Sequence, residues 1–203
     1  MAKVIGIMGE SGSGKTTSLR NLNPETTFYI DCDKKGLSWK GWRKQYNKDN
    51  KNYLRTDDKD AVMEMLAKLN LDNGTLAGIQ KRRGKNPEIL SEKAQETLSK
   101  FNTVVIDTLN GIMVADEVRR MKEKGYDKWV DLAQCVWEIL NYINAMRDDI
   151  TVIVLCHSQT QKEDDGYTFT RIKTSGKKLD KLNIESKLTT VLYATANNGE
   201  YQF

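Results

Sequence analysis

The sequence predicts an α/β fold in which a mostly parallel central sheet is flanked by helices. Four apolar, β-branched runs are nearly continuous in hydrophobicity, which is typical of strands covered on both faces; they lie at Val4–Met8, Thr27–Ile30, Thr103–Ile106 and Thr151–Leu155. Segments with helical apolar spacing separate these runs, and strands that alternate with helices indicate a parallel sheet. With 203 residues, the chain is expected to form a single domain that covers residues 1–203.

Helix signals define the segments between the strands. Apolar spacing, together with the positions of acids and glycines, predicts helices over residues 14–21, 61–69, 88–100, 110–124 and 127–147. In the longest of these, Trp129 and Trp137 fall on the apolar stripe. We therefore expect both rings in the core and not on a base-binding surface.

The pattern changes after Cys156. It predicts an exposed hairpin strand at Tyr167–Ile172, a short amphipathic helix over 177–187 and a last core strand at Thr189–Thr195. A turn at 197–199 then leads into a further strand, so we expect a C-terminal antiparallel strand or hairpin. The chain ends at Phe203 within an apolar pattern, which is compatible with an additional C-terminal tail.

The clearest chemical signal is the phosphate-binding pattern G-x-x-x-x-G-K-[ST], which lies between a predicted strand and a predicted helix. Its glycines permit dihedral angles that turn successive N–H groups toward an anion. Lys15 is expected to reach the β- and γ-phosphates of ATP, and the Thr16 hydroxyl to ligate Mg²⁺. A flexible Gly/Ser loop is the alternative, which both flanking elements disfavour. The predicted nucleotide-binding residues are Gly9, Glu10, Ser11, Gly12, Ser13, Gly14, Lys15, Thr16 and Thr17.

An acid at the end of another apolar strand is a candidate magnesium partner. The segment Val104–Thr108 has the Walker-B form. With this strand placed beside the phosphate-loop strand, Asp107 would hold the water shell of Mg²⁺, and Thr108 would hydrogen-bond nearby. Because Asp107 also precedes a helical segment, a helix N-cap is the alternative. The phosphate-binding pattern in the same chain favours the metal role.

Two other strand ends carry candidate catalytic side chains. Asp33 follows the strand Thr27–Ile30 at the edge where open α/β sheets bind ligands, and it is the candidate that polarises the attacking water. Asp31 is more readily a structural acid that pairs with a basic neighbour. His157, the only histidine, follows the strand Thr151–Leu155 and is either a sensor of the γ-phosphate or a structural residue. It has no Cys or His partner at metal-ligand spacing.

The composition permits nucleic-acid binding without requiring it. The formal net charge is +4 and the isoelectric point is about 8.8. Three cysteines without metal-ligand spacing indicate reduced thiols in a cytoplasmic protein. The sequence has no signal-peptide pattern and no apolar run of membrane-spanning length, so no membrane partner is expected.

Four motifs, taken in order, resemble those of RecA-like recombinases. The phosphate loop resembles that family's own loop, and Phe28–Asp33 resembles the strand that ends in its catalytic glutamate. The segment Val104–Thr108 resembles its Walker-B strand, and Val154–Thr160 resembles the strand whose sensor residue leads to a DNA-binding loop. The nearest resemblance, from Lys3 to about residue 196, is to compact phage ATPases of the Sak type, which act in single-strand annealing.

This resemblance implies a RecA-like P-loop NTPase fold with ATP and Mg²⁺ as ligands, encoded by a phage and located in the cytoplasm of a bacterial host. It assigns Lys15 and Thr16 to phosphate and Mg²⁺, Asp107 to Mg²⁺, and Asp33 to the catalytic carboxylate. Asp33 is one methylene shorter than the family's glutamate, which favours slow or DNA-stimulated hydrolysis. The implied partners are single-stranded DNA, a single-strand DNA-binding protein, and further copies of this chain in a ring or filament formed by surfaces of the core.

Basic residues and aromatic rings alternate in the segment 166–179, which makes it a candidate surface for single-stranded nucleic acid. A solvated hairpin is the alternative. A second basic cluster, residues 81–85, is expected to be a mobile loop between two helices; contact with DNA phosphates or with a neighbour's nucleotide is its alternative role. The candidate DNA-contacting residues of the first segment are Arg171, Lys173, Lys177 and Lys178.

Three functions are compatible with the sequence. The favoured one is a RecA-like ATPase that acts on single-stranded DNA in phage recombination, annealing or replication, with hydrolysis resetting the loop after His157. A nucleotide or small-molecule kinase is the second, although the strand ends at Asp33 and Asp107 suit an ATPase better. The third is a non-hydrolysing module that uses ATP as a switch for DNA binding or assembly.

Overall fold

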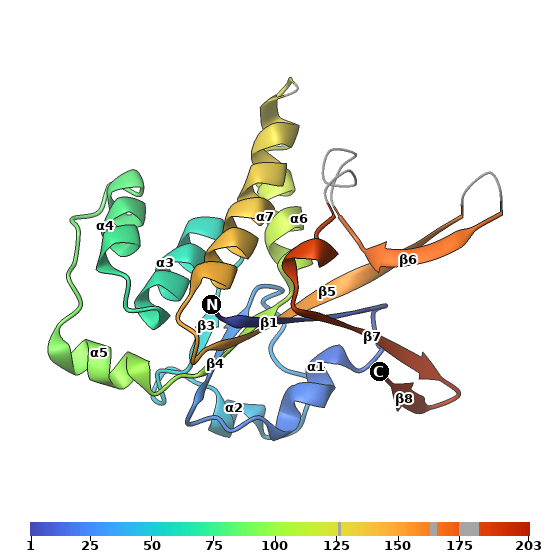
Figure 1. Ribbon diagram of the computed structural model, residues 1–203, viewed down its shortest axis with the longest axis horizontal. Coiled ribbons are helices and arrows are strands. Elements are labelled where there is room, and N and C mark those ends of the chain that lie inside the picture. Colours follow the sequence, from blue (N-terminus) through green and yellow to red (C-terminus); the bar gives the residue numbers. More distant parts are fainter. Residues whose placement is uncertain (126, 163–165, 175–182) are drawn as a thin grey trace.

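The computed structural model describes residues 1–125, 127–162, 166–174 and 183–203, and it confirms a mixed α/β fold with a mostly parallel central sheet (Figure 1). The strand order is β3-β2-β4-β5-β1-β7-β8, and β6 pairs with β5 outside this path. Neighbours from β3 to β7 are parallel, whereas β8 and β6 run antiparallel to β7 and β5. The strands are β1 (Lys3–Gly9), β2 (Thr27–Asp31), β3 (Tyr53–Arg55), β4 (Thr103–Asp107), β5 (Thr151–Lys162), β6 (Thr168–Ile172), β7 (Thr190–Asn197) and β8 (Glu200–Gln202).

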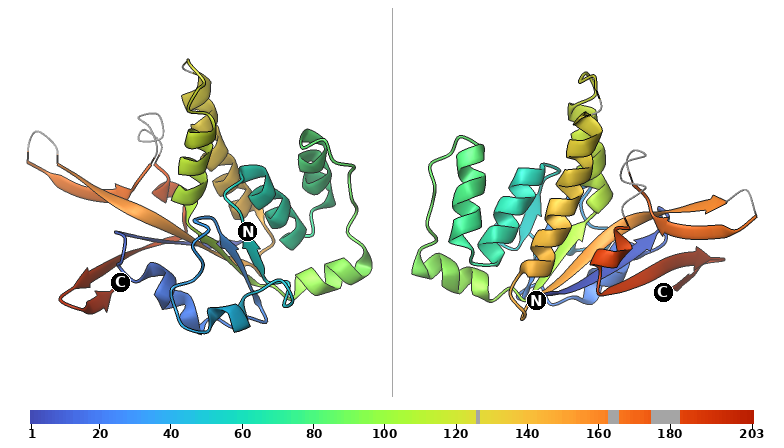
Figure 2. Two further views of the ribbon diagram at one scale, coloured as in Figure 1. Left: turned by 180° about the vertical axis from the view of Figure 1, so that it is seen from behind. Right: turned by 45° about the horizontal axis from the view of Figure 1, so that its top comes forward.

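Helices cover both faces of the sheet, with α3, α6 and α7 on one side and α1 and α2 on the other (Figures 1 and 2). The strands alternate between two cores. Val104 and Ile106 of β4 pack with the helices of the first side, while Val105 between them packs toward Leu19 and Tyr46 on the second. The helices are α1 (Lys15–Ser18), α2 (Trp42–Gln45), α3 (Lys59–Leu69), α4 (Asn73–Arg82), α5 (Glu92–Ser99), α6 (Leu109–Arg119) and α7 (Asp127–Ala145), with short 3₁₀ turns η1 (Leu19–Asn21) and η3 (Glu185–Lys187).

The four predicted core strands are confirmed, but one expected adjacency is wrong. The Walker-B strand β4 does not lie beside the phosphate-loop strand β1, because β5 lies between them. Alternation of strands and helices along a chain does not specify the order of strands in the sheet. The carboxyl ends of β1, β5, β4 and β2 nevertheless meet at one edge, and this edge carries the candidate site.

Two strands differ from the expectation in extent and burial. β5 is longer than predicted and continues to Lys162. Beyond His157 it no longer pairs with the main sheet, and its pairing with β6, from Ser158↔Ile172 to Lys162↔Thr168, extends the strand. The predicted core strand β7 lies next to the edge strand β8, and its side chains at 191–193 are 36–38% exposed. Both tryptophans of α7 are half-buried and not fully in the core.

The basic cluster at 81–85 is only in part the expected loop, because residues 83–85 lie between helices α4 and α5 but residues 81 and 82 are helical. Lys81 and Arg82 end helix α4, which begins after the cap residue Asp72; the Asp72 carboxylate accepts a hydrogen bond from the Thr75 N–H (2.9 Å). Ion pairs hold the cluster on α3 at two points, Arg83–Asp58 (2.6 Å) and Lys85–Glu64 (2.8 Å). The glycines inside this helix and the basic residues at its end are typical of a loop, so the sequence did not predict the helix.

Other predicted helix ends shift by several residues. The helix expected over 88–100 is α5, which begins at Glu92, and the helix expected over 110–124 is α6, which ends at Arg119. Most of the helix expected over 177–187 lies outside the described residues, and its last three residues form the η3 turn.

Candidate nucleotide-binding site

The phosphate loop connects the end of β1 to the start of α1, as its sequence predicts. Gly12 and Gly14 have φ angles of +84° and +86°, in the left-handed region that favours glycine. Gly9 has a steric requirement: a Cβ there would lie 2.4 Å from the Ala194 carbonyl oxygen and 2.6 Å from Ser13 Oγ. The loop shape therefore depends on the glycines of the pattern.

The Lys15 ammonium lies inside this loop. Its Nζ donates hydrogen bonds to the carbonyl oxygens of Gly9 (2.8 Å) and Glu10 (2.7 Å) and to Ser13 Oγ (3.4 Å). Burial lowers the pKa of Lys15, and the nearby Asp107 carboxylate opposes this effect. All three oxygen partners are neutral, so anionic phosphate oxygens are stronger acceptors for the same ammonium.

The Asp107 carboxylate connects β4 to the phosphate loop. Its Oδ2 accepts hydrogen bonds from the Thr16 hydroxyl (2.9 Å) and the Tyr29 hydroxyl (2.6 Å). Burial raises the pKa of Asp107, and the hydrogen bonds from Tyr29 and Thr16 oppose this. Asp107 Oδ1 is buried with no hydrogen-bond partner among the described residues.

These oxygens fit a magnesium ion. Mg²⁺ prefers oxygen ligands and is usually held by one or two protein groups together with substrate phosphates and water. The Thr16 hydroxyl and the unpartnered Asp107 Oδ1 are such groups, beside a loop shaped for phosphate. The N-cap alternative for Asp107 is wrong, because Thr108 caps α6: Thr108 Oγ1 accepts a hydrogen bond from the Gly111 N–H (3.0 Å).

Asp33 lies next to the Walker-B strand end. Its N–H donates to the Asp107 carbonyl oxygen (3.3 Å), and its Oδ1 accepts from the Thr108 hydroxyl (2.8 Å). Its Oδ2 pairs with Lys35 Nζ at 2.6 Å. Burial acts to raise the pKa of Asp33, but the hydrogen bonds from Lys35 and Thr108 outweigh it and lower the pKa. Asp33 is therefore an ionised carboxylate at neutral pH.

Asp31 has the structural role that the sequence left open, although its partners differ from the expected basic neighbour. The side chain is buried, and Oδ2 accepts hydrogen bonds from the Gly36 N–H (2.8 Å) and the Tyr53 hydroxyl (2.7 Å). These bonds fix the turn that carries Asp33 and Lys35.

His157 lies at the point where β5 leaves the sheet, and its backbone is clamped there. Its N–H donates to Asn110 Oδ1 (2.7 Å), its carbonyl oxygen accepts from the Lys173 N–H (2.7 Å), and Asn110 Nδ2 donates to the Lys173 carbonyl oxygen (2.7 Å). Burial lowers the pKa of His157, and the charge of Lys15 adds to the effect. Asn110 was not predicted as a site residue. Its place in the first helical turn after the Walker-B strand, at the edge that binds ligands, was a signal that could have indicated it.

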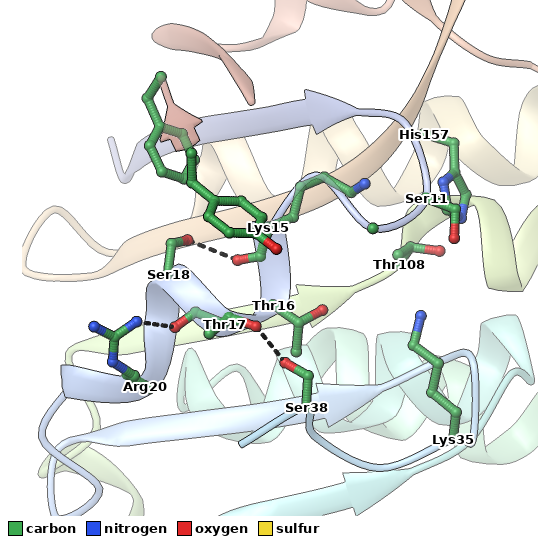
Figure 3. Close-up of a pocket in the computed structure, with 14 residues that line it drawn as sticks. Ser11, Lys15, Thr16, Thr17, Ser18, Arg20, Lys35, Ser38, Thr108 and His157 are labelled. Carbon is green, nitrogen blue, oxygen red and sulfur yellow. Dashed lines mark hydrogen bonds between the residues drawn. The ribbon is translucent and has the colours of Figure 1, made fainter. Parts of the chain in front are cut away.

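A cavity of about 600 Å³ lies at this edge of the sheet (Figure 3), and the carboxylates of Asp33 and Asp107 contact it through Thr108 and Thr16. Lys15, Thr16, Thr108 and His157 contribute to its wall. The sequence analysis missed Lys35, whose side chain rises toward Thr108 in Figure 3. It also missed the lining residues Ser18, Arg20, Ser38, Tyr201 and Phe203.

Of the four predicted DNA-contacting residues, the structure describes Arg171 and Lys173. Arg171 lies on β6, where its guanidinium is 5.0 Å from the centre of the Phe169 ring and donates to Gln161 Oε1 (2.5 Å). Lys173 follows β6, and its backbone N–H and carbonyl oxygen bond to His157 and Asn110. Lys177 and Lys178 lie outside the described residues.

A family model described as AAA domain matches residues 1–202. The chain belongs to this AAA domain family. Among curated proteins, no sequence matches it. The family and the fold together make the AAA domain a P-loop nucleotide-binding protein, in agreement with the loop, lysine and Walker-B acid described above. Among the described helices of the AAA domain, none is long and apolar enough to cross a bilayer.

Proposed function

We propose that this AAA domain is a Mg²⁺-dependent, RecA-like ATPase of phage type that acts on single-stranded DNA in recombination, annealing or replication. The observation that carries the ATPase part is the convergence of three strand ends on one cavity. β1 leads into the loop whose Lys15 and Thr16 line the cavity. At the end of β4, Asp107 accepts a hydrogen bond from Thr16. The ionised Asp33, after β2, accepts one from Thr108, which also lines the cavity. Binding groups and a candidate base therefore lie within one chain of hydrogen bonds.

Each residue has a distinct part in the proposed reaction. Lys15 and the loop amides bind the phosphates, and Thr16 and Asp107 are the groups that would hold Mg²⁺. When bound, Mg²⁺ neutralises charge on the β- and γ-phosphates. Asp33 orients a water molecule and accepts its proton as the water oxygen attacks phosphorus and the bond to the β–γ bridging oxygen breaks. The products are ADP and phosphate.

The β5–β6 hairpin supports the DNA part of the proposal. The rings of Tyr167 and Phe169 are stacked, with centroids 6.2 Å apart and planes 21° apart, and Arg171 lies over Phe169. Stackable rings beside cations suit single-stranded nucleic acid, because every base has a π-face and the backbone is anionic. Asn110 bonds to both His157 and Lys173, so it offers a route from the nucleotide to the hairpin.

The experiment is phosphate release from ATP, measured with and without single-stranded DNA and with a nucleoside monophosphate as acceptor. The proposal expects release that single-stranded DNA stimulates. ADP formation that depends on the acceptor would indicate a kinase, and ATP binding without turnover would indicate a switch.

Asp33→Asn is expected to bind ATP but to turn over at least about 100-fold more slowly, since a positioned general base contributes about 10²–10⁴-fold. The same assay of phosphate release measures this, and equal rates would return Asp33 to a structural role.

Assembly belongs to the same proposal. We infer that copies of this chain form a ring or filament through surfaces of the core, and that a single-strand DNA-binding protein is a further partner. Sedimentation of the protein with Mg²⁺, an ATP analogue and single-stranded DNA tests the first inference, and a purely monomeric species under all of these conditions would contradict it.

A further inference from the structure

Lys35 is a second lysine at the nucleotide cavity, in addition to the lysine of the phosphate loop. It lies on the turn after β2 and lines the same cavity as Lys15 and Thr16. Contacts lead from it to the loop in steps: Lys35 to Asp33 (2.6 Å), and Asp33 to the Thr108 hydroxyl (2.8 Å). Thr108 follows Asp107, whose carboxylate accepts from Thr16 (2.9 Å).

The two side chains of the Lys35–Asp33 ion pair differ in exposure to solvent. The Asp33 side chain is 17% exposed and is fixed from behind by Thr108, whereas the Lys35 side chain is 54% exposed. A half-exposed lysine on a flexible stem can move, while the carboxylate cannot follow it. Lys35 Nζ donates to Asp33 Oδ2, the carboxylate oxygen that a general base would use.

We propose that the Lys35 ammonium leaves Asp33 and pairs instead with the γ-phosphate when a nucleoside triphosphate binds. The exchange has two effects, and it rests on the ATPase function proposed above. The ammonium gains a more highly charged acceptor, which gives the site a preference for triphosphate over diphosphate. Asp33 Oδ2 is released to accept a proton from water, so the carboxylate becomes available only when the γ-phosphate is present.

Electrostatics favours this exchange. Two ammonium groups face one cavity, and the charge of Lys35 is among the causes that lower the pKa of Lys15. A γ-phosphate between them relieves that repulsion, and ADP lacks the group that would draw Lys35 from Asp33. Burial lowers the pKa of Lys35, but the hydrogen bond from Lys35 to Asp33 raises it overall, so the side chain is charged when the nucleotide arrives.

The test compares equilibrium binding of Mg²⁺–ADP and of a non-hydrolysable Mg²⁺–ATP analogue by calorimetry. In Lys35→Gln, the affinity for the analogue is expected to fall about 10- to 100-fold, as for the loss of one charge-assisted hydrogen bond, while ADP affinity stays within about twofold. Lys35→Arg keeps the charge and is expected to retain most of the discrimination. Lys34→Gln is the matched control, because the neighbouring Lys34 pairs with Asp57 (2.7 Å) and does not line the cavity.

The outcomes separate the two proposals. If the wild-type protein binds both nucleotides and Lys35→Gln binds the analogue as tightly as the wild type, the exchange is overturned and the ATPase proposal stands. An equal loss for ADP and the analogue also overturns it, because it shows general support of the site and not recognition of the γ-phosphate. A wild-type protein that binds neither nucleotide overturns both proposals.

Discussion

The loop carbonyls and a nucleotide compete for the ammonium of Lys15. Lys15→Ala removes the charge that the phosphates would meet, and we expect affinity for Mg²⁺–ATP to fall at least about 100-fold, because several charge-assisted hydrogen bonds are lost together. Lys3→Ala, at the exposed opposite end of the same strand, is the control and is expected to bind normally. Undiminished binding by Lys15→Ala in a titration would remove the central assignment of the site.

His157 provides a pH-dependent signal from the same cavity, and as the single histidine it gives one resolvable NMR titration. Burial first, and then Lys15, Lys35 and Lys173, lower its pKa below 6.5, while Asp33 opposes them. The unfolded chain therefore binds this proton more readily, and the stability that neutral His157 contributes is lost as the pH falls from about 6.5 through the folded-state pKa.

We expect the His157 pKa to lie below 6.5 in the free protein and to rise when an ATP analogue binds, because the γ-phosphate offsets the lysine charges. The analogue and ADP are compared at equal saturation. A pKa that neither nucleotide changes would contradict a sensor role and leave His157 as a structural residue.

Among the elements, the first turn of α6 connects the nucleotide edge to the β5–β6 hairpin. Asn110 is buried there and bonds to backbone groups of His157 and Lys173. Asn110→Ala leaves these groups unpaired, so we expect a loss of about 1–3 kcal/mol in the free energy of unfolding. ADP affinity is expected to stay within about twofold, while stimulation of phosphate release by single-stranded DNA is lost.

Asn144→Ala separates this coupling from simple destabilisation. Asn144 also bonds to two backbone carbonyls, those of Leu140 (2.7 Å) and Lys187 (2.8 Å), but it lies on α7 and does not line the cavity. It is expected to lower stability and keep DNA stimulation. If both variants lose stimulation in proportion to stability, α6 is not a connecting element.

For the whole molecule, the sequence was sufficient where the physical signal is local. Continuous apolar runs predicted β1, β2, β4 and the start of β5, because a strand buried on both faces has few polar positions. The phosphate loop was predictable for a similar reason, since its glycines, lysine and threonine act within one turn.

The remainder depends on contacts between distant segments. The order of strands places β5 between β1 and β4, and no pattern along the chain encodes that choice. Lys35 is unremarkable in the sequence and becomes a site residue only because Asp31 bonds to Gly36 and Tyr53 and so fixes its turn. Helix α4 was missed because its glycines suggested a loop, whereas burial of Leu76 and Ile79 stabilises a helix there.

The last prediction concerns the molecule's interaction with DNA. If the segment after β5 contacts single-stranded DNA, joint replacement by glutamine of the four candidate cations should weaken binding and flatten its salt dependence; these are Arg171, Lys173, Lys177 and Lys178. Each lost phosphate contact reduces the slope of log K against log salt by about 0.7 for a single strand, so four contacts correspond to a change of roughly 3.

A matched variant removes four exposed lysines from other surfaces, namely Lys44, Lys48, Lys51 and Lys93. It has the same net charge as the first variant, so a general loss of attraction to DNA would affect both alike. A slope that falls only in the first variant assigns the contact to this segment, and an unchanged slope there excludes it. Because Lys173 bonds to His157 and Asn110 through its backbone N–H and carbonyl oxygen, its side chain can be replaced without breaking these hydrogen bonds.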